Sequence, residues 1–528
     1  MKIERLPNDM LEVVNSNNGL KMYLNNLLEG RERTPRSWLY EHESDTEVLQ
    51  KWLSILETVK STPHGDLVYH FDTSQLKKWG PQGEIAPINE LMELVTEGFA
   101  HAASPQPEPF RSDLWQQAKR IVSIRLTKIT GYRALVPRSY RKVLDDMSAR
   151  DTLESNSGWP DFTRRKKPEV IENALQSIAD GSWREFPSIA LFRNYNQRTR
   201  PVWMYPLSTN IIEGSFTQPL KEAIQMRGSQ FYAPWRGYQH VKEQITFDYE
   251  GGKFLSASDF SHTDAFFLKW QMLEVYDVIK NCFQEQYHEL LKESMLRVCS
   301  IPLVIGPDTW ITGDHGVSSG SNWTNDCETY MDEICEEYNR LLGLVDDLSM
   351  AIGDDISHKR NTYDPKLADK LAGVYKTLGF DVNADKVTNE RDWVKFLQRL
   401  TVRGYYSPIP GSSGQPVLRG IYPTIRALNS LLNPERFHSP KLWSKDMFAV
   451  RCFMIMENCV DHPLFAEFVE FVCKGHAYLT EFAKQPKYVL DSALRESQLI
   501  PGLNATYNQE KRNQSLASFE SIKLASKM

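Results

Sequence analysis

The sequence has few cysteines and no long uninterrupted apolar run. Its 528 residues include seven cysteines, none before position 282, and no two of them form a C-x-x-C pair. This pattern excludes a disulfide framework and a zinc ribbon, and it is typical of a reducing compartment. The most apolar late stretch, residues 447–460, contains Arg451, Glu457 and Asn458, so it is too short and too polar to span a bilayer. The N-terminus lacks the apolar run of a signal peptide, and we expect a soluble protein that is intracellular or enclosed in something that is.

The chain also lacks an excess of basic residues. Its 62 Lys and Arg stand against 68 Asp and Glu, which gives a formal charge of −6. A uniformly basic surface is thereby excluded, although a basic channel inside an acidic shell is not. Hydrophobic residues make up 41% and charged residues 25%, a balance that excludes a disordered or fibrous chain. The length accommodates about three or four lobes.

One segment departs from this acidic balance. Residues 111–150 carry ten Lys or Arg against three Asp, and Arg164-Arg165-Lys166-Lys167 follows soon after. A run of charge is usually only a solvated face of the protein. In an otherwise acidic chain, we interpret this segment as the first sign of a phosphate-binding lobe.

The second half of the chain has a mixed α/β pattern. Apolar alternation and turn residues predict strands over 253–258, 348–352 and 380–383, a helix that begins near Trp323, a helix from Asp364 to Gly379, and mostly helices after Gly404. The alternation over 348–352 is typical of a half-buried strand. Ser444 and Pro463 are expected to begin two of the late helices.

Carboxylates follow two of these predicted strands. The strand over 348–352 turns at Gly353-Asp354-Asp355, and the strand over 253–258 runs into Asp259, with Asp264 five residues later. Taken alone, Gly-Asp-Asp is only a favoured turn. Side by side, the two strand ends would bring Asp259 and Asp354 to one point. Asp346-Asp347 precedes its strand, and we interpret it as a solvated loop.

Such a carboxylate cluster suits a divalent cation. Clustered carboxylates repel one another unless positive charge lies between them. Oxygen ligands on rigid turns favour Mg²⁺ or Mn²⁺, which keep waters and substrate phosphates as further ligands. Two such ions about 4 Å apart can stabilise both oxygens of a phosphoryl displacement.

Seven short segments occur in a characteristic order. They are Ser155–Pro160, Arg198–Val202, Asp259–Asp264, Gly316–Thr324, Gly353–Asp355, Gly379–Lys386 and Phe396–Arg399. In this order they resemble motifs G, F, A, B, C, D and E of viral RNA-dependent RNA polymerases. Each segment alone is weak, but the ordered set is specific and spans roughly half of the chain. The length and the opening Lys2-Ile3-Glu4-Arg5-Leu6-Pro7 are most similar to the picobirnavirus polymerases, with the partitivirus polymerases next.

The resemblance implies a mixed α/β right-hand fold and RNA-directed RNA synthesis. The implied activity is two-metal nucleotidyl transfer from nucleoside triphosphates to an RNA 3′-OH, in replication and transcription of a viral RNA genome. The implied lobes are an N-terminal extension over 1–70, fingers over 71–250 with a palm segment near 205–225, a palm over 251–404, and a thumb with a C-terminal tail over 405–528.

The resemblance also implies roles for individual residues. Asp259, Asp354 and Asp355 would be catalytic ligands of two Mg²⁺ or Mn²⁺ ions, and Lys386 would be the general acid for the pyrophosphate leaving group. Substrate binding would fall to Arg198, Arg200, Asp264, Ser319, Gly320 and Thr324: the two arginines hold the triphosphate and Asp264 faces the ribose. RNA binding would fall to Ser157, Gly158 and Arg399. We expect Phe396 to belong to the thumb-side core.

The sequence departs from the family pattern at one position. The family has Asn four residues after the motif B threonine, whereas this chain has Glu328. A glutamate that faces Asp264 is repelled unless one carboxyl is protonated or a cation intervenes. Asn322 or Asn325 is the candidate substitute.

Two other functions compete with RNA synthesis. One is a reverse transcriptase, which usually carries an aromatic-x-Asp-Asp turn where this chain has Ile352-Gly353-Asp354-Asp355. The other is a non-catalytic RNA-binding structural protein of a virion, which would leave the three aspartates without a role. The expected partners are template and nascent RNA, nucleoside triphosphates and a viral capsid protein, with no membrane. We expect a monomer inside the virion and the host cytoplasm.

Two further hypotheses concern the ends of the chain. The N-terminal segment would bridge the fingers to the thumb. The polar tail over 505–528 would fold into the cavity and help synthesis begin without a primer.

Overall fold

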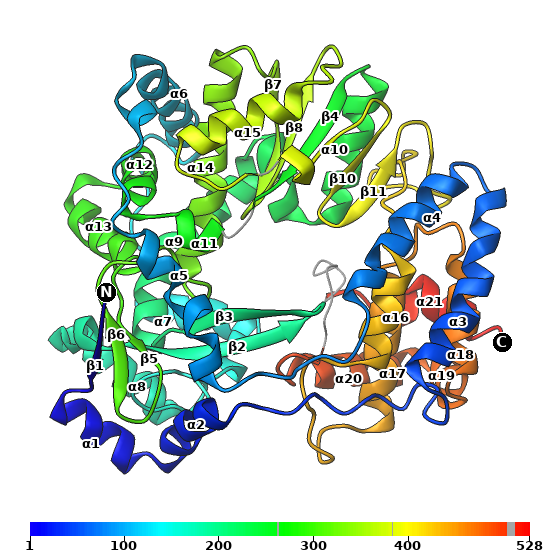
Figure 1. The fold of residues 1–528 in the computed structure, drawn as a ribbon, viewed down its shortest axis with the longest axis horizontal. Helices are drawn as coiled ribbons and strands as arrows, with labels where there is room; N and C mark the ends of the chain where they lie inside the picture. The colour runs from blue at the N-terminus through cyan, green and yellow to red at the C-terminus, as the bar shows by residue number, and fades with distance from the viewer. Residues whose placement is uncertain (261–262, 383, 504–512) are drawn as a thin grey trace.

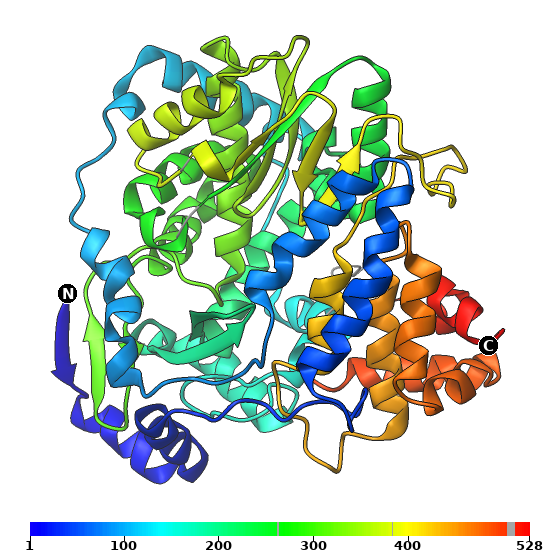
Figure 2. The same cartoon turned by 45° about the vertical axis from the view of Figure 1, so that its right-hand side comes forward.

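The computed structural model describes residues 1–260, 263–382, 384–503 and 513–528. Figures 1 and 2 show three lobes, which are a mixed α/β palm, a fingers lobe built around a second sheet, and a helical thumb. No described helix is long and apolar enough to cross a membrane.

The fingers lobe is built on a sheet that joins distant parts of the chain. Its strand order is β1-β6-β5-β2-β3, with β1 (Lys2–Arg5), β2 (Ser188–Tyr195), β3 (Arg198–Met204), β5 (Leu303–Val304) and β6 (Thr309–Thr312). The helices of this lobe are α1 (Asn8–Ser16), α2 (Asn18–Glu29), α5 (Met92–His101), α7 (Tyr140–Ala149) and α8 (Pro168–Asp180). Helix α13 (His288–Arg297) precedes β5, and its Leu291 and Met295 are buried with residues of α14 (Asn322–Leu341) in the palm. Because β5 and β6 belong to this sheet, the predicted palm over 251–404 contributes a fingers segment.

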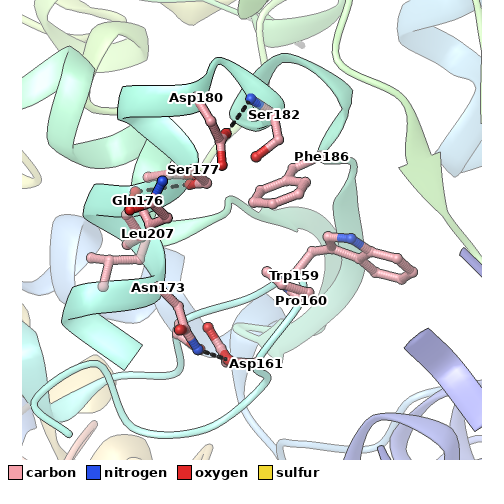
Figure 3. Close-up of a pocket in the computed structure, with 13 residues that line it drawn as sticks. Trp159, Pro160, Asp161, Asn173, Gln176, Ser177, Asp180, Ser182, Phe186 and Leu207 are labelled. Carbon is pink, nitrogen blue, oxygen red and sulfur yellow. Dashed lines mark hydrogen bonds between the residues drawn. The ribbon is translucent and has the colours of Figure 1, made fainter. Parts of the chain in front are cut away.

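A small cavity of about 210 Å³ lies in the fingers beside the motif G-like loop (Figure 3). Trp159 and Phe186 line it together with Asp161 and Asp180. The Asn173 side chain donates to Asp161 at 3.0 Å, and the backbone N–H of Ser182 donates to Asp180 at 2.9 Å. Both carboxylates are therefore held by neighbours within the lobe.

The palm contains a four-stranded sheet in the order β7-β8-β4-β9. Its strands are β4 (Phe254–Asp259), β7 (Asp347–Ile352), β8 (Asp355–Arg360) and β9 (Val387–Asn389), and a hairpin of β10 (Trp393–Phe396) and β11 (Arg399–Val402) follows. The palm helices are α6 (Asp113–Ile129), α9 (Leu207–Arg227), α10 (Tyr238–Glu250), α11 (Thr263–Phe266), α12 (Lys269–Ile279), α14 (Asn322–Leu341) and α15 (Leu367–Thr377). Residues of α6 and α9 share one buried apolar cluster with α14, which extends the palm beyond the predicted segment near 205–225.

Several predicted palm elements need correction. Strand β7 is buried at Leu348, Ser349, Met350 and Ala351 alike, so it is not half-buried, because α14 and residues 230–236 both pack against it. Residues 380–382 form no strand, and Asn383 lies outside the described residues. The next strand is β9, which pairs with β4.

Two further predictions concern α15 and β10. Helix α15 begins at Leu367, and Asp364 accepts a hydrogen bond at 2.9 Å from the backbone N–H of Lys366, so it stabilises the turn before the helix. Gly379 follows the helix with φ +90°, as expected for the residue that ends it. Phe396 is buried as expected, in a cluster that joins Ala257 and Met350 of the palm sheet with Leu418 from the predicted thumb range.

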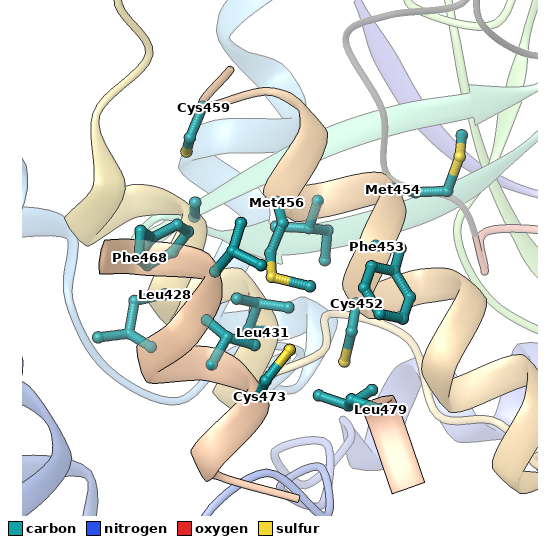
Figure 4. Close-up of a cluster of buried hydrophobic side chains, with 14 of the residues drawn as sticks. Leu428, Leu431, Cys452, Phe453, Met454, Met456, Cys459, Phe468, Cys473 and Leu479 are labelled. Atoms are coloured by element: carbon teal, nitrogen blue, oxygen red, sulfur yellow. The ribbon is translucent and has the colours of Figure 1, made fainter. Parts of the chain in front are cut away.

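The thumb is a bundle with a large apolar core. It contains α16 (Thr424–Leu432), α17 (Lys445–Glu457), α18 (Phe465–Lys474), α19 (Tyr478–Ala483), α20 (Lys487–Gln498) and α21 (Glu520–Ala525). Figure 4 shows Leu428 and Leu431 packed with Phe453, Met456 and Phe468. Ser444 caps α17 as predicted by accepting from the backbone N–H of Met447 at 3.2 Å.

The described end of the C-terminal tail docks onto the thumb core. Leu516, Phe519 and Ile522 are buried in it, and the Glu457 carboxylate accepts from the backbone N–H groups of Glu520 and Ser521 at 3.0 and 2.9 Å. The predicted fold of the tail into the cavity is therefore not seen for residues 513–528. Residues 505–512 lie outside the described part of the chain.

The first 85 residues contact both the fingers and the thumb. Helices α1 and α2 pack on the fingers sheet, whereas α3 (Asp45–Leu56) and α4 (Gly65–Thr73) pack on the thumb core. Between them, Gln82 donates to the carbonyl oxygen of Asn433 in the thumb and accepts from the backbone N–H of Asn196 in the β2–β3 turn at 2.9 Å. These contacts are the ones that a bridging N-terminal segment requires.

Candidate active site

The palm carboxylates gather at one end of the sheet. Strand β4 pairs antiparallel with β8 so that Asp259 lies opposite Asp355, and β7 turns into β8 through Gly353 and Asp354. Gly353 has φ +59°, and a Cβ atom there would lie 2.7 Å from the Asn325 side-chain oxygen. Glycine is therefore favoured at this turn. The backbone N–H of Gly353 donates to the Thr329 hydroxyl at 2.8 Å, which ties the turn to α14.

A cavity of about 580 Å³ lies beside this turn. Most of the sequence-predicted site residues line it: Arg198, Arg200, Asp259, Asp264, Ser319, Gly320, Thr324, Asp354 and Lys386, together with Asn325 and Glu328. Asp355 does not line the cavity, because its place in β8 puts it behind the turn, opposite Asp259. The structure thus brings together residues from five of the seven predicted motifs.

The carboxylates at the turn disfavour one another's ionisation. Burial and the nearby Asp264 and Asp259 carboxylates raise the pKa of Asp354 to about 6. Burial and the charge of Asp354 raise the pKa of Asp355 well above its usual range. A cation between these oxygens would remove the repulsion and lower both pKa values.

The donor set fits Mg²⁺ or Mn²⁺ bound with the substrate. Within the described residues, no group of three or more His, Cys, Asp or Glu is arranged to hold a metal ion by itself. Asp259 and Asp354 instead offer oxygen ligands on a rigid edge that opens into the cavity. Mg²⁺ is commonly bound in this way, by one or two carboxylates with waters and phosphates as the other ligands.

The motif B-like loop is held against both the palm and the fingers. The Ser319 hydroxyl donates to Asp264 at 2.8 Å, and the Thr324 hydroxyl donates to the carbonyl oxygen of Ser318 at 2.6 Å. Gly320 has φ +123°, and a Cβ atom there would clash with the carbonyl oxygen of Trp203 in β3. Thr324 therefore shapes the loop, while Ser319 orients the Asp264 carboxylate.

Glu328 contacts Asp264 without requiring two negative charges. Burial and the charges of Asp264 and Asp354 raise the pKa of Glu328 well above its usual range, and a hydrogen bond joins it to Asp264. A protonated Glu328 donates where an amide N–H would donate in the family pattern. Of the two candidate substitutes, Asn325 lines the cavity, whereas the Asn322 side chain donates to the carbonyl oxygen of Asn210 at 3.0 Å.

The β2–β3 hairpin presents a basic face to the same cavity. Its register places Arg193 opposite Arg200 and Tyr195 opposite Arg198, so all four side chains share one face of the hairpin. The guanidinium carbons of Arg193 and Arg200 lie 4.8 and 5.1 Å from the Tyr195 ring centre. The aromatic ring thus spaces two arginines in the cavity wall.

The three residues predicted to bind RNA lie elsewhere. Arg399 is buried, and its guanidinium donates to the carbonyl oxygens of Gly420 and Asn458 at 3.2 and 2.7 Å. Because the Arg399 guanidinium is bound to carbonyl oxygens inside the protein, the structure does not support RNA binding by this residue. Ser157 is buried beside the cavity of Figure 3, and at Gly158 a Cβ atom would lie 2.6 Å from the carbonyl oxygen of Tyr205. Both residues shape their loop.

Three basic residues near the site were not predicted from the sequence. Arg193 and Arg436 line the cavity, and the pKa of Lys78 is lowered to about 8, mainly by burial and by Arg426, with Asp259 and Arg200 also within its field. Arg193 could have been found from its alternation with Tyr195, which is the spacing of one face of a strand. Lys78 and Arg436 carry no local signal, because only the tertiary fold brings them to the palm.

A carboxylate-edged palm sheet, a basic fingers hairpin and a helical thumb around one cavity define the right-hand polymerase fold. Two solved structures share it over 99% of both chains: the RNA-dependent RNA polymerase of a human picobirnavirus (TM-score 0.81, 21% identity) and the insertion loop deletion mutant of such a polymerase (TM-score 0.80, 22% identity). These matches confirm the predicted fold class.

A curated relative agrees with the structural matches. The chain is 25% identical over 485 residues to a "potential RNA-dependent RNA polymerase" of human picobirnavirus (strain Human/Thailand/Hy005102/-), which covers 87% of this chain and 85% of the relative. No family model matches the sequence. The resemblance to viral RNA-dependent RNA polymerases, and to those of picobirnaviruses in particular, is thereby confirmed.

Proposed function

We propose that this chain is a viral RNA-directed RNA polymerase that adds nucleotides from nucleoside triphosphates to the 3′-OH of RNA on an RNA template. One observation supports this most directly: Asp259, Asp354 and Asp264 line the same cavity as Arg198, Arg200 and Lys386. Carboxylates and cations in one cavity are the two kinds of group that phosphoryl transfer requires.

The residues of the cavity would have different roles in nucleotidyl transfer. Asp259 and Asp354 would hold two Mg²⁺ or Mn²⁺ ions, with Asp355 behind them in the sheet. When bound, the ions would supply positive charge to the attacking and leaving oxygens.

On the opposite side of the substrate, the Arg198 and Arg200 guanidinium groups would bind the triphosphate through their planar donor forks. Lys386 would protonate the pyrophosphate leaving group.

The sugar would be recognised next to the motif B-like loop. Ser319 donates to one oxygen of Asp264 at 2.8 Å, and Glu328 bonds to the same carboxyl group. An oriented Asp264 carboxylate can accept a hydrogen bond from a ribose 2′-OH, the group that distinguishes RNA from DNA precursors. This arrangement favours ribonucleotides over the deoxynucleotides that a reverse transcriptase would use.

The proposed role in the virus follows from this activity. The polymerase would replicate and transcribe a viral RNA genome, contact the viral capsid protein, and act as a monomer inside the virion and the host cytoplasm. Template and nascent RNA would occupy the space between fingers and thumb that the N-terminal segment spans.

Incorporation of labelled nucleotide on an RNA template with Mg²⁺ or Mn²⁺ tests the proposal. We expect the parent to incorporate ribonucleotides well above deoxynucleotides, and Asp354→Asn to lose about a hundred-fold or more of this activity. Asp347→Asn is the matched control, because Asp347 lies at the far end of the same strand with its side chain 61% exposed. An active Asp354→Asn variant, or a parent inactive with every template, primer and metal, would contradict the proposal.

A further inference from the structure

The thumb contributes one arginine to the wall of the palm cavity. Arg436 follows α16 in the loop that leads to α17, and it is the single lining residue from the described part of the chain after position 404. It belongs to none of the seven motif-like segments. The roles implied for those segments therefore do not account for its place in the cavity.

The surroundings of Arg436 hold more positive than negative charge. Glu435 forms a two-point ion pair with Arg193 at 2.8 and 2.7 Å, so it is already neutralised. Within the described chain no carboxylate forms an ion pair with Arg436. Partial burial, together with Arg193 and Arg31, lowers the pKa of Arg436. Positive charges that lie close together repel one another, and a bound anion would reduce that repulsion.

The cations lie on the cavity wall that faces the palm carboxylates. Arg193 and Arg200 are directly opposite across the hairpin, and Arg436 reaches the cavity from the thumb next to Arg193. Arg200 in turn lies within the electrostatic field of Asp354. The row of guanidinium groups thus leads from the carboxylate edge toward the thumb, which suits a ligand with several negative charges in a line.

We propose that Arg436 binds the polyphosphate of the nucleoside triphosphate in this cavity and so lets the thumb contact the substrate directly. The inference rests on the proposed function and adds a thumb residue to it. Each charge-assisted hydrogen bond from a guanidinium fork to a phosphate oxygen strengthens binding of the triphosphate. Arg436 touches the substrate only at its phosphates, so it affects nucleotide affinity more than turnover.

Three variants separate phosphate binding from packing. Arg436→Gln removes the charge but keeps part of the aliphatic stem, which packs close to Gly502. Arg436→Lys keeps the charge but loses the fork. Lys441→Gln is the control, because Lys441 is an exposed cation in the same thumb loop that does not line the cavity.

The first measurement is direct binding of inorganic tripolyphosphate to the full chain by calorimetry, without metal or RNA. We expect Arg436→Gln to weaken it about ten-fold or more, Arg436→Lys to weaken it less, and Lys441→Gln to match the parent. Equal affinity in the parent and Arg436→Gln, with equal melting temperatures, would overturn the inference. A lower melting temperature with unchanged affinity would assign Arg436 to packing and overturn it as well.

The second measurement is the KM and kcat for nucleotide in primed RNA synthesis. Arg436→Gln should raise KM about ten-fold while kcat changes little, and Lys441→Gln should change neither. A loss confined to kcat would overturn the inference. Because the calorimetry needs no catalysis, failure of the proposed function appears as an inactive parent, whereas failure of this inference appears as an active parent with an unaffected Arg436→Gln.

Discussion

The palm edge and the joint between the N-terminal segment and the thumb hold their carboxylates in opposite ways. At the palm edge, Asp354 is surrounded by Asp259 and Asp264, and each charge raises its pKa. At the joint, the buried Asp72 of α4 accepts from the Thr424 backbone and hydroxyl at 3.0 and 2.6 Å, and from the Ile425 N–H at 2.9 Å.

His462 also contacts Asp72, at 3.0 Å. The two regions therefore use their carboxylates differently. A carboxylate whose lone pairs are satisfied by donors stabilises the fold, whereas carboxylates that repel one another are ready to bind a cation.

Removal of the Asp72 carboxylate from the joint should lower the stability of the protein. Asp72→Ala leaves the buried N-terminal N–H groups of α16 and the His462 ring without their acceptor, so we expect a loss of roughly 3 kcal/mol or more in the free energy of unfolding. Denaturant unfolding followed by tryptophan fluorescence measures it. Asp66→Ala, an exposed acid on the same helix, should cost about 0.5 kcal/mol or less. Equal losses of unfolding free energy in Asp72→Ala and Asp66→Ala would contradict a stabilising role for the Asp72 carboxylate.

A substitution beside the palm edge should reduce nucleotide incorporation more than it reduces stability. At Gly320 a Cβ atom would clash with Trp203, so Gly320→Ala must move the loop and displace Ser319 from Asp264. We expect nucleotide incorporation to fall about ten-fold or more. Gly343→Ala is the matched control: its φ is +75°, but nothing lies within 4 Å of the added Cβ atom. It should cost about 1 kcal/mol of stability and leave incorporation unchanged.

The repulsion at the palm edge predicts a pH dependence in metal-free protein. The pKa of Asp354 is about 6 in the folded chain, against about 3.9 when unfolded. The folded state therefore holds this proton to higher pH, and stability is lost as pH rises from about 4 through about 6. Melting temperatures over this range should fall less in Asp354→Asn than in the parent, and Mg²⁺ should flatten the parent's profile. Parallel profiles for the two proteins would contradict this account.

The smallest effect is expected at the ion pair between Arg193 and Glu435. Their side chains are 40% and 17% exposed, so Glu435→Gln should cost about 1 kcal/mol or less. The loss should shrink in high salt because mobile ions screen the pair. Thermal unfolding at two salt concentrations measures it, with Glu470→Gln, from a more exposed pair within α18, as the control. A salt-independent loss would mean that the pair acts through packing.

The sequence predicted the palm edge well because its signals are local. A strand that ends in Asp259 and a Gly-Asp-Asp turn each occupy a few consecutive residues, and adjacent strands bring them together. The half-buried prediction for β7 failed because Ser349 and Ser357 satisfy each other at 2.7 Å, so polar residues could be buried.

The joint was less predictable because its partners are distant in sequence. Asp72 contacts Thr424 and His462, which follow it by 352 and 390 residues, and no local pattern indicates those contacts. The resemblance to motif E implied RNA binding by Arg399, yet its guanidinium donates to the carbonyl oxygen of Asn458 and lies over the Tyr238 ring inside the fold. Arg436 enters the cavity only through the docking of the thumb.

The most direct test of the central claim is a Mn²⁺ titration followed by electron paramagnetic resonance in the presence of nucleoside triphosphate. The account predicts that the parent binds two ions per chain and that Asp259→Asn with Asp354→Asn abolishes this binding. Asp346→Asn with Asp347→Asn, which alters the neighbouring acid pair on the other end of β7, should leave it intact. Unchanged Mn²⁺ binding in the first double variant would contradict the claim that the palm edge is the catalytic metal site.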